Sequence, residues 1–511
     1  MSISENNKRI ARNTMILYIR TLFVMLISLY TSRVILQALG VEDYGVYQVV
    51  GGMVSMFSVI SSSLSSAISR FITFEIGHGD RQKLERIFAT SVVIQLILAV
   101  VVFVVAEILG YWFMQTQMQI PEGRMHAARW VLHCSLITFC INLISVPYNA
   151  CIVAHEHMKA FAYVSLIEVT FKLIVCFLLY ISPIDKLVFY AVLLTLVAVL
   201  IRLIYGYYCH KHFDESRVKL VFDRQIFKEM FGFAGWSFFS NTAHIFNSQG
   251  VNMLMNVYFG VVVNAARGIA NQVEQAVLQF VNNFTTAINP QITKSYASGE
   301  LEKMHLLVCR GARFSFFAML VMALPLICEA ETILSIWLVG VPQHTVIFVQ
   351  LSLIMGMLDC IGNSGFTACM ATGRLKKYAL VITTIGFLEF PLTWIFFKYG
   401  APVVSTYYLY ILVKAIVLIA RMFLLQDMVG LHVRIYMQQV FIPIVLTTLV
   451  AILPSILLLY FVEASFLRLI FSVGVGVVSV ILSGLYVGMT RNERVVILQK
   501  VMEFKSRLIK K

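Results

Sequence analysis

The sequence has little charge for its length. Only 13% of its 511 residues are Asp, Glu, Lys or Arg, and 59% are hydrophobic. A typical soluble domain is about a quarter charged and 45–50% apolar. Charge this sparse excludes an ordinary soluble globular protein, and it indicates that most of the surface faces lipid.

Metal-binding and disulfide patterns are also scarce. The nine cysteines are scattered, and no two of them form a C-x-x-C pair. Two His-x-His fragments, His155–His157 and His210–His212, fall in short polar loops without a third ligand spaced nearby. We therefore expect no disulfide framework. We interpret both fragments as solvated loops, and we predict neither a metal site nor a cofactor.

Apolar segments long enough to cross a bilayer, about 20 residues each, recur along the chain. They predict an all-α integral membrane protein of about fourteen transmembrane helices. The first apolar run is too long for a cleavable signal, and no small-residue cleavage site follows it. The spans are predicted near residues 13–36, 44–68, 87–109, 128–152, 162–182, 187–208, 231–257, 262–289, 312–334, 345–371, 378–397, 403–425, 439–461 and 466–489.

The basic residues behind the formal charge of +14 are distributed according to the predicted topology. With the N-terminus inside, 29 of the Lys and Arg residues fall in cytoplasmic segments and 5 in outer loops. This asymmetry predicts that both termini are cytoplasmic. It also explains the basic charge without a nucleic-acid partner.

The two halves of the chain look related. A shift of 220 residues places Gly40 on Gly260 and Gly79 on Gly299. Six spans separate the copies, so both share one orientation, as in transporters built from parallel repeats. We expect two six-helix lobes and an appended pair of helices. The predicted boundaries are residues 1–215 for helices 1–6, 216–430 for helices 7–12, and 431–511 for helices 13–14 with a basic cytoplasmic tail.

Three predicted spans carry polar stripes, with side chains recurring every three or four residues on one helix face. Amides cannot face hydrocarbon without a partner, so each stripe must face protein or water. Small serines favour helix packing in the second span, whereas the bulky amides of the eighth favour a water-filled cavity. The candidate substrate-contacting residues are Gln48, Ser55 and Ser62 in the second span, Asn241, His244 and Asn252 in the seventh, and Asn264, Asn271, Gln275, Gln279 and Asn282 in the eighth.

Charged residues inside spans are rare and mark functional sites by default. Four basic residues are candidates for a positive cavity: Arg20, Arg33, Arg267 and Lys414. Arg33 and Arg267 lie near outer helix ends, where snorkelling to the interface is the alternative. Arg267 is the strongest candidate because it lies within the amide stripe of the eighth span. Glu168 and Lys172 are four residues apart, and we expect that they can neutralise each other.

One segment carries a family resemblance. Residues 32–45 read S-R-V-I-L-Q-A-L-G-V-E-D-Y-G and lead into Gly51-Gly52, Ser69-Arg70-Phe71 and Gly77-His78-Gly79-Asp80. The run R-x-x-L-x-x-L-G-x-x-D-Y-G resembles the N-terminal region of bacterial polysaccharide flippases. These are the O-antigen (Wzx-type) transporters of the MATE-like multidrug/oligosaccharidyl-lipid/polysaccharide exporter superfamily. The motif covers about fifty residues, and elsewhere the resemblance is one of topology.

The resemblance implies a transporter of the bacterial inner membrane and no catalytic residue. Its substrate would be an undecaprenyl-diphosphate-linked oligosaccharide, flipped to the outer leaflet by alternating access for O-antigen, lipopolysaccharide or capsule biosynthesis. The implied partners are this lipid, the bilayer and other polysaccharide-assembly membrane proteins. A diphosphate attracts Arg and Lys, and amides and hydroxyls suit a glycan. An ion gradient, the membrane potential and downstream consumption all stay open as driving forces.

Two other functions remain alternatives. A MATE-type exporter of cationic drugs or metabolites would favour an acidic cavity, but the first span contains no acid. A membrane glycan polymerase or ligase would need catalytic groups on a sizeable outer loop. The longest outer loop, residues 110–127, offers only Glu122, Arg124 and His126. Loop length therefore favours a transporter over an enzyme.

Overall fold

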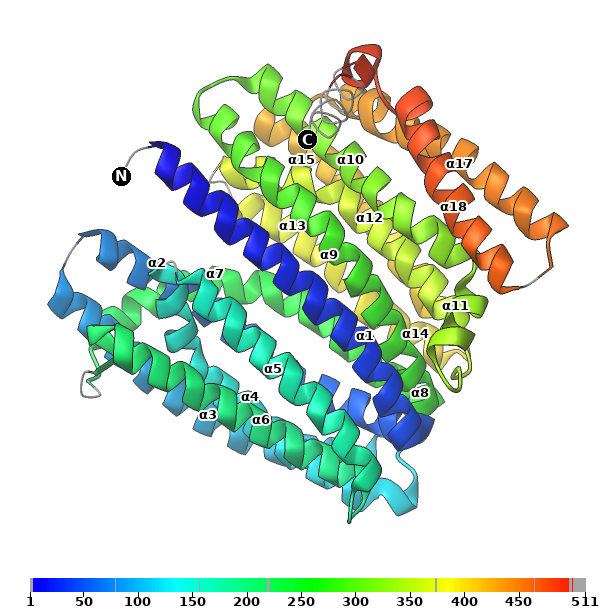
Figure 1. Cartoon of the computed structure of the whole chain (residues 1–511). Helices are drawn as coiled ribbons and strands as arrows, with labels where there is room; N and C mark the ends of the chain where they lie inside the picture. The colour runs from blue at the N-terminus through cyan, green and yellow to red at the C-terminus, as the bar shows by residue number, and fades with distance from the viewer. Residues whose placement is uncertain are drawn as a thin grey trace, which may run out of the picture. The chain divides into compact units, whose positions relative to one another are not determined.

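The computed structural model describes residues 3–78, 80–155, 157–217, 221–372, 375–463, 465–495 and 499. Within these ranges the chain forms helices joined by turns, and no strand (Figure 1). The all-α prediction is confirmed. The helices are α1 (Ile3–Ser55), α2 (Ser58–His78), α3 (Arg81–Thr116), α4 (Met125–Ala154), α5 (Met158–Leu178), α6 (Lys186–His212), α7 (Arg224–Ile245), α8 (Val251–Phe259), α9 (Val261–Ala297), α10 (Leu301–Cys328), α11 (Ala330–Trp337), α12 (Thr345–Ala371), α13 (Leu375–Phe387), α14 (Glu389–Lys398), α15 (Ser405–Val429), α16 (Val433–Tyr436), α17 (Ile442–Phe461) and α18 (Phe466–Ser483). Short 3₁₀-helices are η1 (Glu122–Arg124), η2 (Leu179–Ile181) and η3 (Asp214–Arg217), and short π-helices are η4 (Phe246–Gly250), η5 (Met437–Phe441) and η6 (Gly484–Gly488).

Helix α1 contains a backbone break at Gly40, where φ is 82° and ψ is 172°. Gly260, between α8 and α9, has nearly the same conformation, with φ 81° and ψ −177°. L-residues with a side chain rarely adopt this region, so glycine suits both positions. The two glycines that the 220-residue shift pairs therefore make the same local turn. This supports the internal repeat at that point.

Contacts between Cα atoms divide the chain into two compact units. The first comprises Met1–Gly268, Leu338–Gln343 and Phe390–Val403, and the second comprises the remaining segments. The division falls within α9, directly after Gly268. The predicted lobe boundaries stay a prediction.

The first unit is built on contacts of α4 with α3 and α6, of α1 with α4 and α5, and of α2 with α7. Its core gathers Val46 and Val50 of α1, Met114 of α3, Leu132 of α4 and Leu187 of α6. Two helix starts are capped by aspartates, as expected for N-cap residues. Asp80 accepts a hydrogen bond from the Lys83 amide at 3.0 Å, and Asp185 caps α6.

In the second unit α12 packs between α10 and α15, and α17 and α18 lie side by side (Figure 1). Two arginine–glutamate pairs tie the last helices to α10 and the turn after it. Buried Arg313 donates to both Glu493 oxygens at 2.7 and 2.6 Å, and Arg468 donates to both Glu329 oxygens at 2.9 and 3.0 Å. Burial opposes ionisation of Glu493, but the Thr490 amide and the arginines outweigh it and lower the pKa of Glu493.

Eleven helical segments among the described residues are long and apolar enough to cross a membrane. The chain is therefore a multi-pass membrane protein. The polar helices α2, α7 and α9 are not among the eleven. These are the predicted second, seventh and eighth spans, so the count of about fourteen and the N-in, C-in topology stay predictions.

Candidate functional site

Three asparagines of the first unit form a buried network where α8 meets α9. Asn264 donates to the carbonyl and the side-chain oxygen of Asn252 at 2.8 and 3.0 Å, and it accepts from Asn256 at 3.1 Å. The Asn256 oxygen in turn accepts from the Gln119 amide at 3.0 Å. Asn264 and Asn256 are fully buried. Two of the predicted site residues, Asn252 and Asn264, therefore lie together, and the network links α8, α9 and the segment that follows α3.

The backbone of α1 closely approaches the start of α9, the helix that supplies Asn264. A Cβ at Gly45 of α1 would overlap the carbonyl of Val261, the first residue of α9. The absence of that atom lets the second part of α1 lie directly against the start of α9. Gln48, another predicted site residue, then lies directly over the Gly268 backbone. The polar stripes of the predicted second and eighth spans thus meet within the first unit.

Arg267 lies in the same region and is only 9% exposed. Its guanidinium donates to the Met255 sulfur at 2.8 Å and to the Ser248 carbonyl at 3.1 Å. Its Nε has no hydrogen-bond partner among the described residues. Both bonds go to neutral groups, so this buried cation does not hydrogen-bond a carboxylate of the part of the chain that the structure describes. Its side chain lies inside the helix bundle, which differs from the snorkelling alternative.

The amide stripe of α9 changes character along the helix. Asn264 and Arg267 are buried, and Asn271 is half-buried. Gln275, Gln279 and Asn282, all in the second unit, are exposed. Four- and three-residue steps place these last three on one face of the helix.

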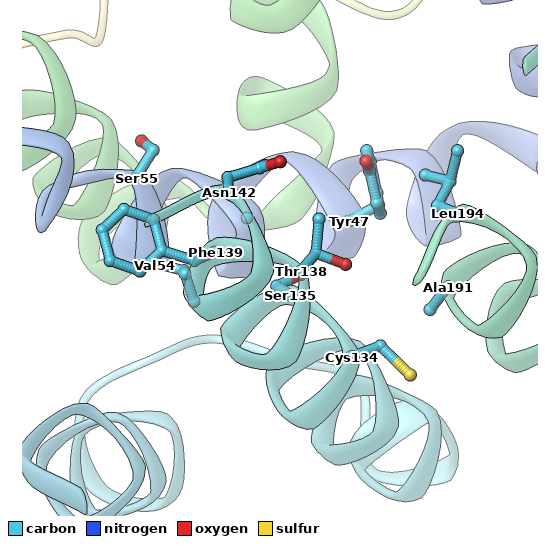
Figure 2. A pocket seen from close by; sticks show the side chains of 11 residues that line it. Tyr47, Val54, Ser55, Cys134, Ser135, Thr138, Phe139, Asn142, Ala191 and Leu194 are labelled. Carbon is cyan, nitrogen blue, oxygen red and sulfur yellow. The ribbon is translucent and has the colours of Figure 1, made fainter. Parts of the chain in front are cut away.

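A cavity of about 210 Å³ with polar and apolar side chains in its wall lies within the first unit, between α1, α4 and α6 (Figure 2). Predicted Ser55 lines it, with its hydroxyl donating to the Gly52 carbonyl at 2.7 Å. Figure 2 shows α4 contributing Ser135, Thr138 and Asn142 to the same wall. These α4 residues were missed by the sequence analysis, although their spacing of three and four on an apolar helix was available as a signal.

The other predicted positions are dispersed. Ser62 is exposed and donates to the Val59 carbonyl at 3.1 Å, and Arg33 is half-buried in α1. Lys414 of α15 forms a salt bridge of 2.6 Å with Asp359 of α12. The side chains of Arg20, Asn241 and His244 lie outside the described residues.

The expected pairing of Glu168 and Lys172 is confirmed, with Nζ 2.6 Å from Oε1. A similar pairing neutralises Lys414, whose partner Asp359 also accepts from the Tyr410 hydroxyl at 3.2 Å. Arg267 and Lys414 therefore differ in their immediate surroundings, since only Lys414 contacts a carboxylate directly.

Residues 10–296, more than half of the chain, match the sequence family described as polysaccharide biosynthesis protein. The chain belongs to this family. The matched region of this polysaccharide biosynthesis protein contains the asparagine network, Arg267 and the cavity of Figure 2. Lys414 lies beyond it.

One curated relative is the uncharacterized membrane protein EpsK of Bacillus subtilis (strain 168). It is 20% identical over 324 residues, which is 62% of this chain and 63% of its own length. The match therefore spans less than two thirds of that relative.

Solved structures show the fold. The lipid II flippase MurJ, in an inward closed conformation, matches with a TM-score of 0.69 at 11% identity, covering 91% of this chain and 97% of its own. An inward-facing multidrug resistance MATE family transporter of the MOP superfamily matches with 0.63 at 16%, covering 81% and 98%. A MOP superfamily transporter from Pyrococcus furiosus matches with 0.56 at 16%, covering 83% and 95%. The predicted MATE-like fold and the resemblance to polysaccharide exporters are confirmed, and both point to a transporter or flippase.

One residue of the family motif, Asp43, belongs to a cluster of ion pairs in this polysaccharide biosynthesis protein. Asp43, from the D-Y-G of the motif, accepts two hydrogen bonds from Arg124 at 2.5 and 2.6 Å. Asp185, the cap of α6, accepts two more at 2.6 and 3.1 Å. Hydrogen bonding to Asp185 is the main cause that raises the pKa of Arg124. Burial opposes ionisation of Asp185, but Arg124 and the backbone amides of α6 outweigh it and lower the pKa of Asp185. Arg124, predicted as an outer-loop residue, therefore ties α1 to the starts of α4 and α6.

Proposed function

We propose that this chain is a flippase for an undecaprenyl-diphosphate-linked oligosaccharide, moving it from the inner to the outer leaflet of a bacterial cytoplasmic membrane by alternating access. Membership of the polysaccharide biosynthesis protein family and the transporter fold support the class of protein. The transported substrate is the glycan together with its lipid carrier, and the end product is a surface polysaccharide such as O-antigen or capsule.

The observation that carries the proposal is the exposed amide face of α9. Gln275 and Gln279 are exposed on a long helix, whereas many exposed side chains of the other described helices are large and apolar. An amide exposed to hydrocarbon without a partner costs several kcal/mol. Water or a hydroxylated ligand satisfies such amides, so this face suits a path for a glycan.

The cavity of Figure 2 supplies further groups of the same kind. Ser135, Thr138 and Asn142 offer two hydroxyls and an amide, and Tyr47 adds an aromatic ring. Hydroxyls and amides both donate and accept hydrogen bonds, as sugar hydroxyls require. We propose that this wall contacts sugar residues during transport.

Arg267 is the proposed contributor of positive potential for the diphosphate. Its hydrogen bonds go to neutral groups, so its charge is not cancelled by a bonded carboxylate. A cation in a poorly solvated site attracts an anion more strongly than one in water. We propose that Lys414, which is paired with Asp359, contributes less.

The experiment is a clean deletion of the gene in its native host. Lipid-linked oligosaccharide should accumulate on the inner leaflet, and surface polysaccharide should fall. A plasmid copy of the wild-type gene should restore both. The quantities measured are the amount of lipid-linked glycan and its accessibility to a membrane-impermeant lectin, in right-side-out and inverted vesicles.

Three results would contradict the proposal, each in a different way. Normal export of lipid-linked glycan in the deletion strain would remove the flippase function. Single repeat units delivered outside without polymerisation or ligation would assign the chain to the polymerase or ligase class. Unchanged glycan together with hypersensitivity to cationic drugs would assign it to the drug exporters.

A further inference from the structure

The two His-x-His fragments, for which the sequence favours solvated loops, come together in the first unit. His155 and His157 follow α4, whereas His210 and His212 belong to the last turn of α6, and the His157 and His212 rings lie 6.2 Å apart. Nε2 of His155, directly after α4, lies 2.6 Å from Oε1 of Glu215 in η3. The thiol of Cys151, in the last turn of α4, donates to the same oxygen at 3.1 Å. Glu215 is distant in sequence from the other two, which is why spacing along the chain did not indicate the group.

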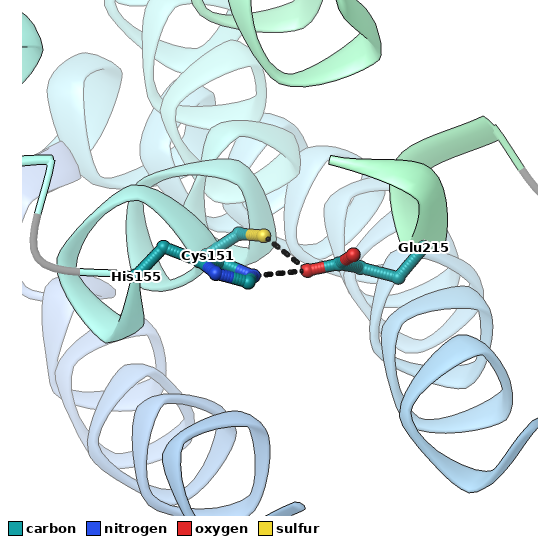
Figure 3. A group of neighbouring side chains, drawn as sticks. All are labelled: Cys151, His155 and Glu215. Atoms are coloured by element: carbon teal, nitrogen blue, oxygen red, sulfur yellow. Dashed lines mark hydrogen bonds and ion pairs between the residues drawn. The ribbon is translucent and has the colours of Figure 1, made fainter. Parts of the chain in front are cut away.

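These three side chains present one donor atom each toward a common point. The sulfur, the imidazole nitrogen and the carboxylate oxygen all lie within 4.8 Å of one another. Cys151 and Glu215 are buried, and His155 is half-buried. Figure 3 shows the thiol and the imidazole on one side and the carboxylate facing them.

The ring of His155 is held in place from behind. It stacks on Phe213, with ring centroids 4.4 Å apart and planes inclined by 14°. Phe213 is followed by Asp214 and Glu215, so the same turn orients both the imidazole and the carboxylate. Fixed ligand orientation of this kind is typical of metal sites, where supporting groups set the direction of the first ligands.

A cavity of about 360 Å³ opens onto the group. His155 and Glu215 line it, together with His157, His212 and the acidic residues Glu75, Asp80, Glu85 and Asp214. Arg81 is the one Lys or Arg among the twelve residues that line it, and Lys83 pairs with Glu75 at 2.9 Å. This balance of charge favours entry of a hydrated cation over an anion.

We propose that Cys151, His155 and Glu215 form a binding site for a zinc-class transition-metal ion. Thiolate, imidazole and carboxylate together match the ligands of Zn²⁺, and three protein ligands with one open position describe an accessible site. The open position faces the cavity. On binding, the thiol releases its proton to water, and the sulfur becomes the ligand.

The two distances to the Glu215 oxygen need only a small adjustment, and the sulfur and nitrogen already lie within 4.8 Å of each other. Bond lengths of about 2.0–2.3 Å in a tetrahedron require about 3.4 Å between nitrogen and oxygen and about 3.6 Å between sulfur and oxygen. The observed distances are 2.6 and 3.1 Å, so the Glu215 carboxylate has to move back by less than about 1 Å. A glutamate side chain can do this by rotation. The bound metal joins η3, which follows α6, to the end of α4.

The test uses the full-length protein in nanodiscs, stripped of metal with a chelator. Wild type should bind one Zn²⁺ per chain by elemental analysis, and Co²⁺ should give the absorption of a tetrahedral thiolate complex. Cys151→Ser should abolish the sulfur-to-cobalt absorption. Glu215→Gln keeps shape and hydrogen bonding, and it should weaken Zn²⁺ binding by about 100-fold or more, since even supporting groups cost 10–100-fold.

Matched controls separate this site from adventitious binding. Cys176→Ser removes another buried thiol of the same unit, and Asp214→Asn removes the neighbouring carboxylate. Both should bind Zn²⁺ like wild type. Zn²⁺ should also raise the melting temperature of wild type and of both controls, but not that of Glu215→Gln. Equal binding by wild type and Glu215→Gln, or equal losses in Cys151→Ser and Cys176→Ser, would overturn the site.

Discussion

Replacing Asn264 by alanine tests whether the first part of the α9 stripe serves stability. Asn264 is fully buried and makes three hydrogen bonds, two to Asn252 and one from Asn256. The substitution leaves the Asn252 oxygen without that donor. It leaves the Asn256 amide with a single bond of 3.5 Å to the Gln119 carbonyl.

The magnitude follows from these lost partners. Interhelical hydrogen bonds in membranes contribute about 0.6 kcal/mol on average, and each buried group left without a partner costs about 1–3 kcal/mol. We therefore expect Asn264→Ala to destabilise the protein by about 2–4 kcal/mol. The combination with Asn252→Ala should cost less than the sum of the two single changes, because both remove the same bonds.

The assay is thermal unfolding in detergent followed by size-exclusion chromatography, with glycan export measured in parallel. Gln279→Ala is the matched control, since it removes an exposed amide from the same helix. It should melt like wild type and reduce export. If Asn264→Ala melts like wild type while Gln279→Ala is destabilised, the division of the stripe into a supporting part and a substrate-contacting part is wrong.

Three further predictions concern charged groups. Arg267→Lys should keep part of the glycan export, and Arg267→Glu should lose most of it, because the proposal requires positive charge. Full export by Arg267→Glu at normal membrane abundance would remove Arg267 from the mechanism. Lys414→Ala should lower the stability by about 1–3 kcal/mol, because it leaves Asp359 without its cation; breaking a fully buried ion pair costs about 3–5 kcal/mol. Adding Asp359→Asn should restore the melting temperature, and failure to do so would refute the pairing argument. The folded pKa of Asp185 lies below its unfolded value of about 3.9, so the stabilisation by its carboxylate is present above about pH 4 and is lost as pH falls through the folded pKa. Asp185→Asn should therefore reduce the loss of thermal stability between pH 5 and 3. An unchanged pH profile would contradict the role of the Arg124 cluster.

The sequence was sufficient for the class of fold because that class depends on composition and periodicity. Long apolar runs with few charges indicate membrane helices, and the residues around Gly40 were enough to indicate the family. The polar stripe of α9 was also visible, since side chains on one face recur at a fixed spacing. Pairing of Glu168 with Lys172 was predictable for the same reason, because both residues lie on one helix.

Contacts between helices were not predictable in this way. The sequence grouped Asn264 and Gln279 into one stripe, whereas the structure buries the first against Asn252 and exposes the second. It likewise grouped Lys414 with Arg267, although Asp359 from another helix neutralises only Lys414. Spacing along one helix contains no information about what the neighbouring helix supplies.

The amino-acid sequence by itself determined that this protein is helical and membrane-embedded, with polar stripes on some of its helices. Those properties arise from local geometry and from the cost of placing polar groups in hydrocarbon. Only the tertiary structure decided which polar groups are satisfied inside the protein and which remain available. Cys151, His155 and Glu215 illustrate the reason: their meeting depends on the end of α4 approaching η3, and no property of any one segment encodes that approach.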